Sequence, residues 1–386
     1  MATTEERAGA LPRLARAAVL AVFFVNGAGL AAWLSRIPAI KDGLGAGEGA
    51  LGLALLGGPA GLLLALAPMS ALLVRYGSKR MTMCAGLAYC AALPLPGFAP
   101  SLPLLGAALV ALGATTGAMT LSMNAQAVGV EKAYGRPILS SVHGMFSAGG
   151  IVGAGLGGLV AEAGIDPGAH LGATAALLAV VVLVAAGALM DDSGPREPGP
   201  IFARPTGALV GLGVIAFCAL MAEGAIADWS AVYLSSSLGA RPSIAAAGFA
   251  FFSVAMTVSR LSGDRLTMRL GASAVVRAEG AAATVGMVLA LAWASPIAAV
   301  AGFGLVGLGI ASMFPLALSA AGRTPGMRSP VALAAVTSAG YTGLLASPPV
   351  IGLTAELTSL RAALGLVVAC TIVAGLLARR MAVHED

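Results

Sequence analysis

The segment from Met119 to Gly150 reads MTLSMNAQAVGVEKAYGRPILSSVHGMFSAGG and places polar side chains in an apolar background. The chain contains two asparagines, Asn26 and Asn124, and one glutamine, Gln126, and all three lie in apolar segments rather than in loops. A buried amide costs about 1 to 3 kcal/mol unless hydrogen-bond partners satisfy it. We therefore interpret this segment as part of the functional core, and the rest of the chain as the scaffold around it.

The composition is typical of a chain embedded in a lipid bilayer. Of its 386 residues, 58% are hydrophobic and 10% are charged, whereas about 25% of the residues in soluble domains are charged. The mean hydropathy of +0.93 excludes an ordinary soluble domain. The 53 glycines suit helices that pack closely in lipid, because small residues allow two backbones to approach each other.

The composition also excludes several functional classes. The net charge of +5 is not accompanied by a basic run with interleaved aromatic residues, so we expect no nucleic-acid partner. The four cysteines include no pair at metal-ligand spacing, which argues against both a disulfide and a zinc site. No HExxH, GxxxxGK or GxSxG motif occurs. We therefore predict that the protein is not an enzyme, holds no metal and needs no cofactor.

Twelve apolar segments, each near the length that a bilayer requires, follow one another along the chain. They cover approximately residues 14–36, 48–73, 80–98, 102–130, 138–162, 170–190, 207–234, 243–264, 273–293, 296–321, 330–355 and 360–380. The stretch from Asp191 to Pro205 contains four prolines and mixed charges, which stop a helix. We predict an all-α membrane protein of twelve transmembrane helices in two six-helix bundles, residues 1–190 and 207–386, with a cytoplasmic linker over residues 191–206.

The positively charged residues predict the orientation in the membrane. With the N-terminus in the cytoplasm, 18 of the 22 Lys and Arg residues fall on the cytoplasmic side. The four exceptions are Arg36, Lys41, Arg241 and Arg361. Positive charge is enriched in cytoplasmic loops of membrane proteins, so we expect both termini in the cytoplasm.

The two halves of the chain resemble each other. Trp33 matches Trp229, and the Ser-Ala-Gly triplet at residues 147–149 matches the triplet at residues 338–340, at offsets of about 190 to 196 residues. A six-helix unit that occurs twice in parallel is expected of a transporter whose two bundles rock about a site near the membrane midplane.

Several motifs resemble the major facilitator superfamily over essentially all twelve predicted helices. The loop RYGSKR at residues 75–80 is similar to the basic motif between the second and third helices of that family, and GDRLTMRLG at residues 263–271 is its counterpart in the second half. The first copy departs from the pattern, with Val74 at the usual aspartate position and Ser70 at the usual glycine position. Further motifs resemble the fucose-permease-like branch: MNAQAVGVE at 123–131, GRPILSSVHGMFSAGG at 135–150 and SPPVIGLTAE at 347–356.

The resemblance implies both a fold and an activity. Helices 1, 4, 7 and 10 would line a central cavity, and the activity would be proton-coupled transport of a small solute. We expect a monomer in a bacterial inner membrane, with a small polar solute such as a sugar or polyol, protons and the lipid bilayer as its partners. Two alternatives stay open: an exporter of small amphipathic compounds by proton antiport, and a sensor that transports nothing. An integral-membrane enzyme, a third class, is disfavoured because the motifs named above do not occur.

Two acids in the predicted seventh helix are candidates for proton coupling. Glu223 lies near the middle of residues 207–234, where an acid costs at least about 2.5 to 3.5 kcal/mol unless it is protonated, paired or in contact with water. Such an acid can take up and release a proton during transport, or can stay protonated and bond to a neighbouring helix. Asp228 lies five residues further on and about 140 degrees around the helix, so an outer gate is an equal alternative to a binding role.

Six residues are candidates for contact with the solute: Asn26, Trp33, Asn124, Gln126, Trp229 and Tyr341. Asn26 and Trp33 share one face of the first helix, and an amide beside an indole suits a sugar. Tryptophan near a helix end is also a common interface anchor, so a structural duty for the two tryptophans is an equal alternative. Asn124 and Gln126 lie on different stripes of the fourth helix. We place Asn124 toward the cavity, and Gln126 would then tie its helix to a neighbour.

Five further residues are candidates for gating or structural roles: Glu131, His143, Arg260, Asp264 and Arg265. Glu131 lies near Lys132 and Arg136, which predicts a solvated or gating ion pair. His143 titrates near neutral pH and is suited to relay protons, although a neutral imidazole packed against another helix is the more common outcome. Asp264, with Arg260 and Arg265, is expected to form a charge relay in the second half.

Overall fold

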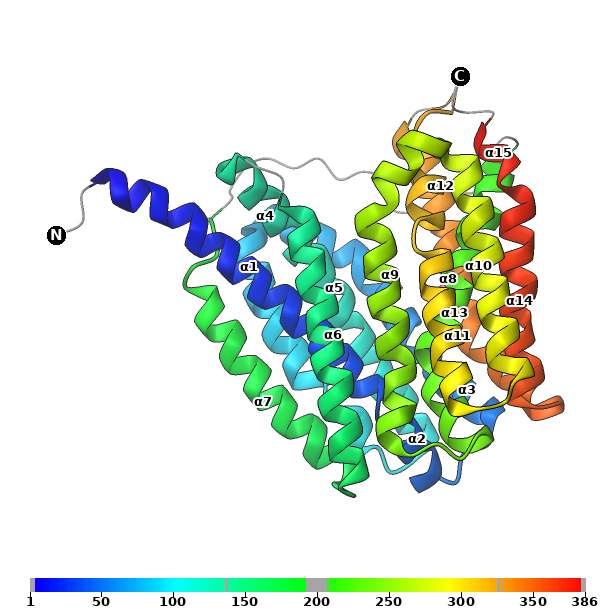
Figure 1. Cartoon of the computed structure of the whole chain (residues 1–386). Helices are drawn as coiled ribbons and strands as arrows, with labels where there is room; N and C mark the ends of the chain where they lie inside the picture. Colours follow the sequence, from blue (N-terminus) through cyan, green and yellow to red (C-terminus); the bar gives the residue numbers. More distant parts are fainter. Residues whose placement is uncertain are drawn as a thin grey trace. The chain divides into compact units, whose positions relative to one another are not determined.

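The computed structural model describes residues 4–135, 138–191, 207, 209–324, 327 and 329–382, with side chains left out at 4–12, 140, 264, 329, 330 and 382. Its regular elements in these ranges are helices (Figure 1). They are α1 Thr4–Leu34, α2 Ile37–Gly43, α3 Glu48–Leu55, α4 Gly57–Ala92, the short η1 Leu95–Phe98, α5 Leu102–Tyr134, α6 Leu139–Glu162, α7 Pro167–Ala186, α8 Leu209–Val232, η2 Tyr233–Ser237, α9 Pro242–Leu270, α10 Ala272–Ala292, α11 Pro296–Ile310, α12 Met313–Gly322, α13 Ser329–Leu357, α14 Leu360–Leu377 and α15 Arg379–Ala382.

Eleven helical segments of the described chain are long and apolar enough to cross a bilayer, whereas the sequence predicts twelve. The difference lies in one segment of 51 residues, Glu48–Phe98, which covers both predicted helices 48–73 and 80–98. Gly77 interrupts this segment with a φ of 78° and a ψ of 163°, so two helices meet there within α4. A positive φ is readily adopted only by glycine, which explains the glycine of the RYGSKR loop.

The chain divides into two compact units. One comprises Met1–Arg36 and Ala60–Pro198, and the other comprises Ile37–Pro59 and Gly199–Asp386. Ile37–Pro59 comes from the first half of the sequence but belongs to the second unit, because α3 packs against α13. The predicted linker over residues 191–206 lies outside the described residues apart from Asp191.

The first unit is built around the contact between α1 and α6. Gly149 and Gly153 of α6 lie against α1: a Cβ atom on Gly153 would stand 2.2 Å from the carbonyl oxygen of Ala28, and one on Gly149 would stand 2.2 Å from that of Phe24. The two backbones are therefore in direct contact. Helix pairs in lipid commonly pack in this way, because small residues let the backbones approach closely.

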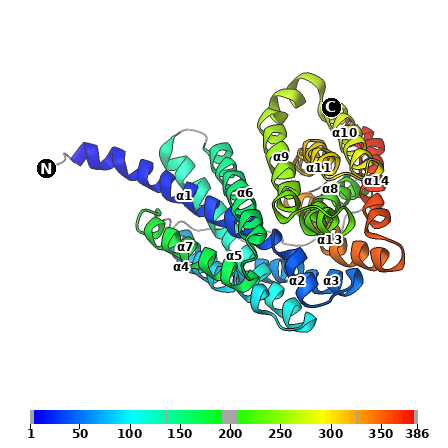
Figure 2. The ribbon, with the colours of Figure 1, turned by 60° about the horizontal axis from the view of Figure 1, so that its bottom comes forward.

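The second unit repeats this arrangement with α8 and α13. A Cβ atom on Gly343 of α13 would stand 2.2 Å from the carbonyl oxygen of Phe217 on α8. Gly343 follows Gly153 by 190 residues, in agreement with the sequence repeat. Helix α8 is the central helix of this unit, since it contacts α9, α11, α12, α13 and α14 (Figure 2).

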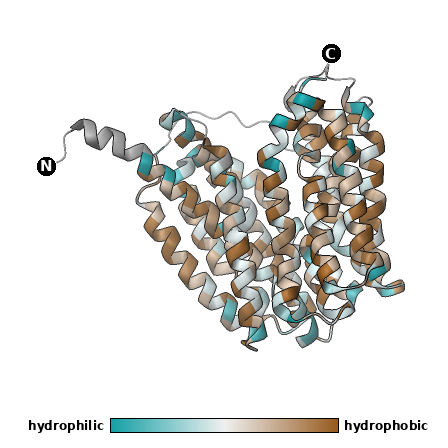
Figure 3. Cartoon of the chain, viewed as in Figure 1, coloured by the Kyte–Doolittle hydropathy of each residue, from teal (hydrophilic) through white to brown (hydrophobic). Residues whose placement is uncertain are grey.

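The outer faces of the helices are apolar. Leu64, Val184 and Ile297 expose 69%, 76% and 80% of their surface. Figure 3 shows apolar residues along the helices, with the hydrophilic residues mainly toward the helix ends. Large apolar side chains exposed in such numbers would aggregate in water, whereas acyl chains solvate them.

Candidate functional site

The second unit holds an ion pair between two membrane-spanning helices. Glu223 on α8 is half-buried, and its Oε2 lies 3.9 Å from Nη2 of Arg260 on α9. Glu223 also interacts electrostatically with the phenol of Tyr341 on α13. The structure therefore brings together three predicted residues, to which the sequence assigned a proton-coupling, a gating and a substrate-binding role.

The tenth predicted helix, 296–321, is broken into α11 and α12. Pro315 has no N–H group, so the carbonyl of Ala311, four residues earlier, loses its partner within the helix. Ala311 and Ser312 form a turn between the two helices. Irregular backbone at membrane depth is tolerated where other groups satisfy its donors and acceptors.

Side chains of α9 and α10 satisfy the backbone groups that this break frees. Nε of Arg260 donates to the carbonyl of Ala311 at 3.3 Å, and the hydroxyl of Ser259 donates to the carbonyl of Leu308 at 3.0 Å. The N–H of Ser312 donates to both carboxylate oxygens of Glu279, at 3.1 and 3.3 Å. Arg260 thus contacts both Glu223 and the break.

Glu279 is a residue that the sequence reasoning missed. It lies within the predicted helix 273–293, and in the structure it is 8% exposed on α10. Arg260 acts on it electrostatically. Glu279 could have been found in the sequence by the argument that identified Glu223, because both are acids within an apolar segment. We call Glu223, Arg260, Glu279 and Ser312 the Arg260 cluster.

The remaining charged candidates of this unit lie outside the cluster. Asp228 is half-buried on α8, and within the described chain it makes no hydrogen bond or ion pair. The adjacent Trp229 is fully buried, and its Nε1 has no partner among the described residues. Arg265 is exposed, whereas the side chain of Asp264 is outside the described part, so the predicted relay through Asp264 stays a prediction.

Two amides of the first unit lie on different helices. Asn26 is 2% exposed on α1, its backbone oxygen accepts from the hydroxyl of Tyr89 at 3.1 Å, and its Nδ2 has no partner among the described residues. Asn124 is half-buried on α5 and donates to the carbonyl of Thr120 on its own helix at 2.8 Å. Trp33 is buried near the end of α1.

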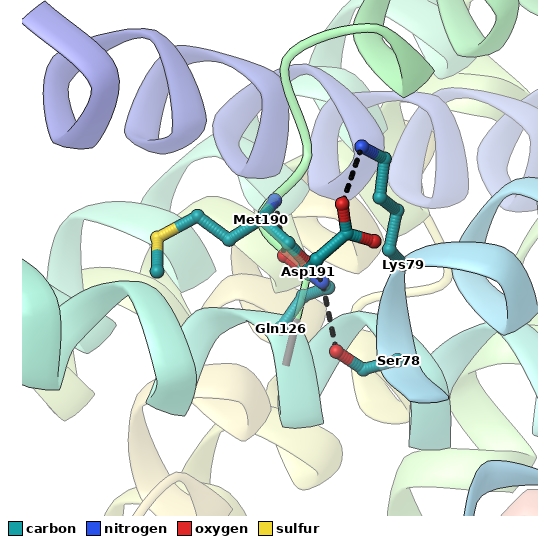
Figure 4. A network of polar contacts seen from close by, with 5 residues as sticks. All are labelled: Ser78, Lys79, Gln126, Met190 and Asp191. Carbon is teal, nitrogen blue, oxygen red and sulfur yellow. Dashed lines mark hydrogen bonds and ion pairs between the residues drawn. The ribbon is translucent and has the colours of Figure 1, made fainter. Parts of the chain in front are cut away.

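Gln126 joins three parts of the first unit (Figure 4). Its Nε2 donates to the hydroxyl of Ser78 on α4 at 2.8 Å and to the carbonyl of Met190 at 2.5 Å. Its Oε1 accepts from the N–H of Met190 at 3.3 Å. Beside it, Lys79 pairs with Asp191 at 3.2 Å. The RYGSKR loop is therefore held to α5 and to the chain that follows α7, and Gln126 makes the helix connection that its stripe predicts.

Glu131 and His143 make structural contacts. The carboxylate of Glu131 accepts from the N–H groups of Ile138 and Leu139 at 2.8 and 3.1 Å. An acid at this position satisfies free N–H groups at the start of α6 and favours its dipole. Its predicted partner Arg136 lies outside the described residues. The ring of His143 packs edge-on against Phe23, with centroids 5.2 Å apart.

No group of three or more His, Cys, Asp or Glu side chains that could hold a metal ion occurs in the described ranges. The arrangement is instead a bundle of apolar helices, two of them in close contact in each unit, with a small set of charged groups around a helix break. This arrangement is typical of secondary transporters, whose substrate and ion sites use discontinuous helices.

Comparison with known proteins identifies the family. The chain is 38% identical over 345 residues to an uncharacterised MFS-type transporter of Yersinia pestis. The matched region covers 89% of this chain and 90% of the relative. It is 32% identical to the membrane protein MosC of Rhizobium meliloti, over 94% of this chain and 90% of the relative, and 33% identical to the uncharacterised transporter y4wD of Sinorhizobium fredii, over 95% and 96%. No family model matches the sequence. The chain belongs to the major facilitator superfamily.

Solved structures show the same fold. A mutant of the nucleoside transporter NupG matches with a TM-score of 0.76 at 13% identity, over 96% of this chain and all of that one. A bacterial homologue of the human lysosomal transporter Spinster matches with a TM-score of 0.70 at 15% identity, over 96% of each chain. The predictions of a multi-pass bacterial membrane protein and of this superfamily are confirmed. The fucose-permease-like branch stays a prediction.

Proposed function

We propose that this transporter moves a small polar solute together with protons by alternating access, and that Glu223 is a proton-exchanging carboxylate of that cycle. The observation that carries the proposal is the contact of Glu223 with Arg260, at 3.9 Å between two membrane-spanning helices. An ionisable residue inside a membrane helix is costly unless it has a partner, and such residues mark ion and substrate pathways.

The pair provides a physical route from proton binding to a change in contacts. When Glu223 is ionised, it attracts the guanidinium of Arg260, and when it binds a proton this attraction is lost. Arg260 is then free to change its contacts. Because Arg260 also holds the carbonyl of Ala311 at the helix break, such a change reaches α11 and α12. Proton binding at α8 thereby affects the broken helix.

Several features support a small polar cargo such as a sugar or polyol. The described spans contain few charged groups, so a strongly ionic cargo would lack partners. Nδ2 of Asn26 and Nε1 of Trp229 are buried donors without a described partner, and hydroxyl groups accept from such donors. NupG, which shares the fold, is a nucleoside transporter, so nucleosides belong among the solutes to be tested.

The proposal includes the finer topology. Twelve transmembrane helices result if the 51-residue segment Glu48–Phe98 crosses the membrane twice around Gly77. With the bias of the positive residues, both termini would lie in the cytoplasm. The six-helix halves at residues 1–190 and 207–386 would move relative to each other in a monomer.

The test is transport by the purified protein in liposomes. Solute-driven proton movement is measured across sugars, polyols, nucleosides and hydrophobic amines, with Glu223→Gln as the variant and Asp42→Asn, a change in an exposed acid outside the cluster, as its control. We expect uptake of a polar solute coupled to inward protons, lost in Glu223→Gln and kept in Asp42→Asn. Unaltered coupling in Glu223→Gln would remove this residue from the mechanism. Antiport of hydrophobic amines alone would replace the symporter by an exporter.

A further inference from the structure

The Arg260 cluster contains two carboxylates and one guanidinium. Glu223 on α8 lies 3.9 Å from Arg260. Glu279 on α10 accepts from the N–H of Ser312, the residue after Ala311, whose carbonyl accepts from Arg260. With both acids ionised, the cluster would carry one uncompensated negative charge among apolar helices. A buried charge without a partner is strongly unfavourable, and a buried acid then binds a proton instead.

The surroundings of the two acids differ. Glu279 is 8% exposed, and its described hydrogen bonds come from the N–H and the hydroxyl of Ser312. The side chain of Glu223 is 35% exposed and is the one that lies within 4 Å of Arg260. A protonated Glu279 can accept from the N–H of Ser312 and donate its O–H to the Ser312 hydroxyl. The observed contacts therefore suit a proton on Glu279 and an ionised Glu223.

Other charged groups are poorly placed to neutralise Glu279. The charged residues on the helices packed against α10 are Arg260, Asp264, Arg265 and Arg269 on α9, Arg361 on α14, and Arg379 and Arg380 on α15. Arg277 of α10 itself donates to the hydroxyl of Ser273. Of the described side chains, Arg260 is the charged one that acts on Glu279.

We infer that Glu279 is a second proton-exchanging carboxylate, which shares Arg260 and one proton with Glu223. When the proton is on Glu279, Arg260 pairs with Glu223; when the proton is on Glu223, Arg260 pairs with Glu279. The net charge of the cluster is zero in both states. This inference rests on the proposed proton-coupled transport and adds the residue that stores the proton.

The exchange has a mechanical consequence at the helix break. The end of α11 is fixed on α10, because a Cβ atom on Gly309 would stand 2.4 Å from both the carbonyl oxygen of Glu279 and the N of Ala283. Beyond the break, α12 is tied to α9 and α10 through Ala311 and Ser312. A change in which acid Arg260 pairs with alters these ties. Motion is therefore expected in α12 rather than in α11.

The experiment measures proton movement in liposomes for the wild type, Glu223→Gln, Glu279→Gln and Thr284→Val. Thr284 is a matched control, since it lies on α10 and its hydroxyl bonds to Thr371 at 2.8 Å, away from the cluster. In Glu279→Gln one carboxylate and one guanidinium remain, Glu223 and Arg260. Their charges cancel when both are ionised, so the cluster no longer needs a bound proton to be neutral. We expect its solute-driven proton movement to fall at least about tenfold and the pH dependence of its solute exchange to flatten, whereas Thr284→Val behaves as the wild type.

Infrared spectroscopy gives a readout that a structural role of Glu279 would not produce. Difference spectra between acidic and alkaline pH are expected to contain a protonated-carboxyl band that Glu279→Gln lacks and Thr284→Val keeps. If Glu279→Gln does not fold, Glu279→Asp decides: a shifted pH midpoint of exchange supports the inference, and an unchanged midpoint overturns it.

The outcomes separate this inference from the proposed function. If the wild type moves no protons with any solute, the proton-coupled function itself fails. If the wild type is coupled, Glu223→Gln is not, and Glu279→Gln keeps the wild-type proton movement and pH profile, the proposed function stands and the role of Glu279 is refuted.

Discussion

The ion pair between Glu223 and Arg260 predicts a measurable coupling energy. Two unit charges 4 Å apart attract each other by about 1 kcal/mol in water and about 4 kcal/mol near a protein surface. The observed separation is 3.9 Å, and the two side chains are 35% and 50% exposed. Because solvent screens half-exposed charges, we expect a coupling of about 1 to 2 kcal/mol at neutral pH.

A double-mutant cycle isolates this coupling. Glu223→Gln, Arg260→Gln and the double variant are unfolded by SDS in detergent micelles, and the free energy of unfolding is compared with the wild type. Arg260→Gln should cost about 1 to 3 kcal/mol more than Glu223→Gln, because it also leaves the carbonyl of Ala311 without a donor. That extra cost persists in the double variant and cancels from the cycle.

Two results would contradict this reasoning. A coupling energy near zero would mean that the two charges do not stabilise each other, and the proposed proton site would lose its structural basis. Equal costs for Glu223→Gln and Arg260→Gln would mean that Arg260 does not hold the helix break. Arg260→Lys is the matched variant, because its single ammonium keeps the charge but has no Nε to donate to Ala311.

Three further predictions concern stability and the break. Gly153→Ala should lower the free energy of unfolding by about 1 to 3 kcal/mol, because its Cβ atom would stand 2.2 Å from the backbone of α1. The control Gly155→Ala should leave the stability unchanged or raise it, because a Cβ atom there meets nothing within 4 Å. Equal thermal midpoints of the two variants would refute this. Gln126→Leu should lower the free energy of unfolding by about 1 to 3 kcal/mol, because buried groups lose their partners; an unchanged SDS midpoint would contradict it. Pro315→Ala restores a backbone N–H donor for the carbonyl of Ala311, so the helix can continue through the break. It should slow solute uptake without loss of thermal stability. Wild-type uptake rates would show that the break is dispensable.

The broad class was predictable from the sequence because it depends on local properties. Whether a segment spans a bilayer depends on its own length and apolar content, and all but two of the twelve predicted spans correspond to separate helical segments. The other two, 48–73 and 80–98, lie in one continuous segment, because the two helices meet at Gly77 in a sharp backbone turn and no longer connection separates them. Residue pairings were harder to predict: the bonds from the N–H groups at the start of α6 to Glu131 were not anticipated. The expected ion pair of Glu131 with Arg136 stays a prediction, because Arg136 lies outside the described residues.

The sequence by itself determined that this chain is a helical membrane protein with internally repeated halves and an unusual acid at Glu223, because composition, periodicity and the rarity of charge act within single segments. Only the tertiary structure decided that Glu223 meets Arg260, and that Glu279 meets the break at Ser312. The physical reason is that a helix that is apolar on all sides has no distinct polar face, so its sequence does not show which side packs against which neighbour. Its facing depends on close contacts with neighbours, such as that of Gly309 with α10, and those contacts involve residues far apart in the chain.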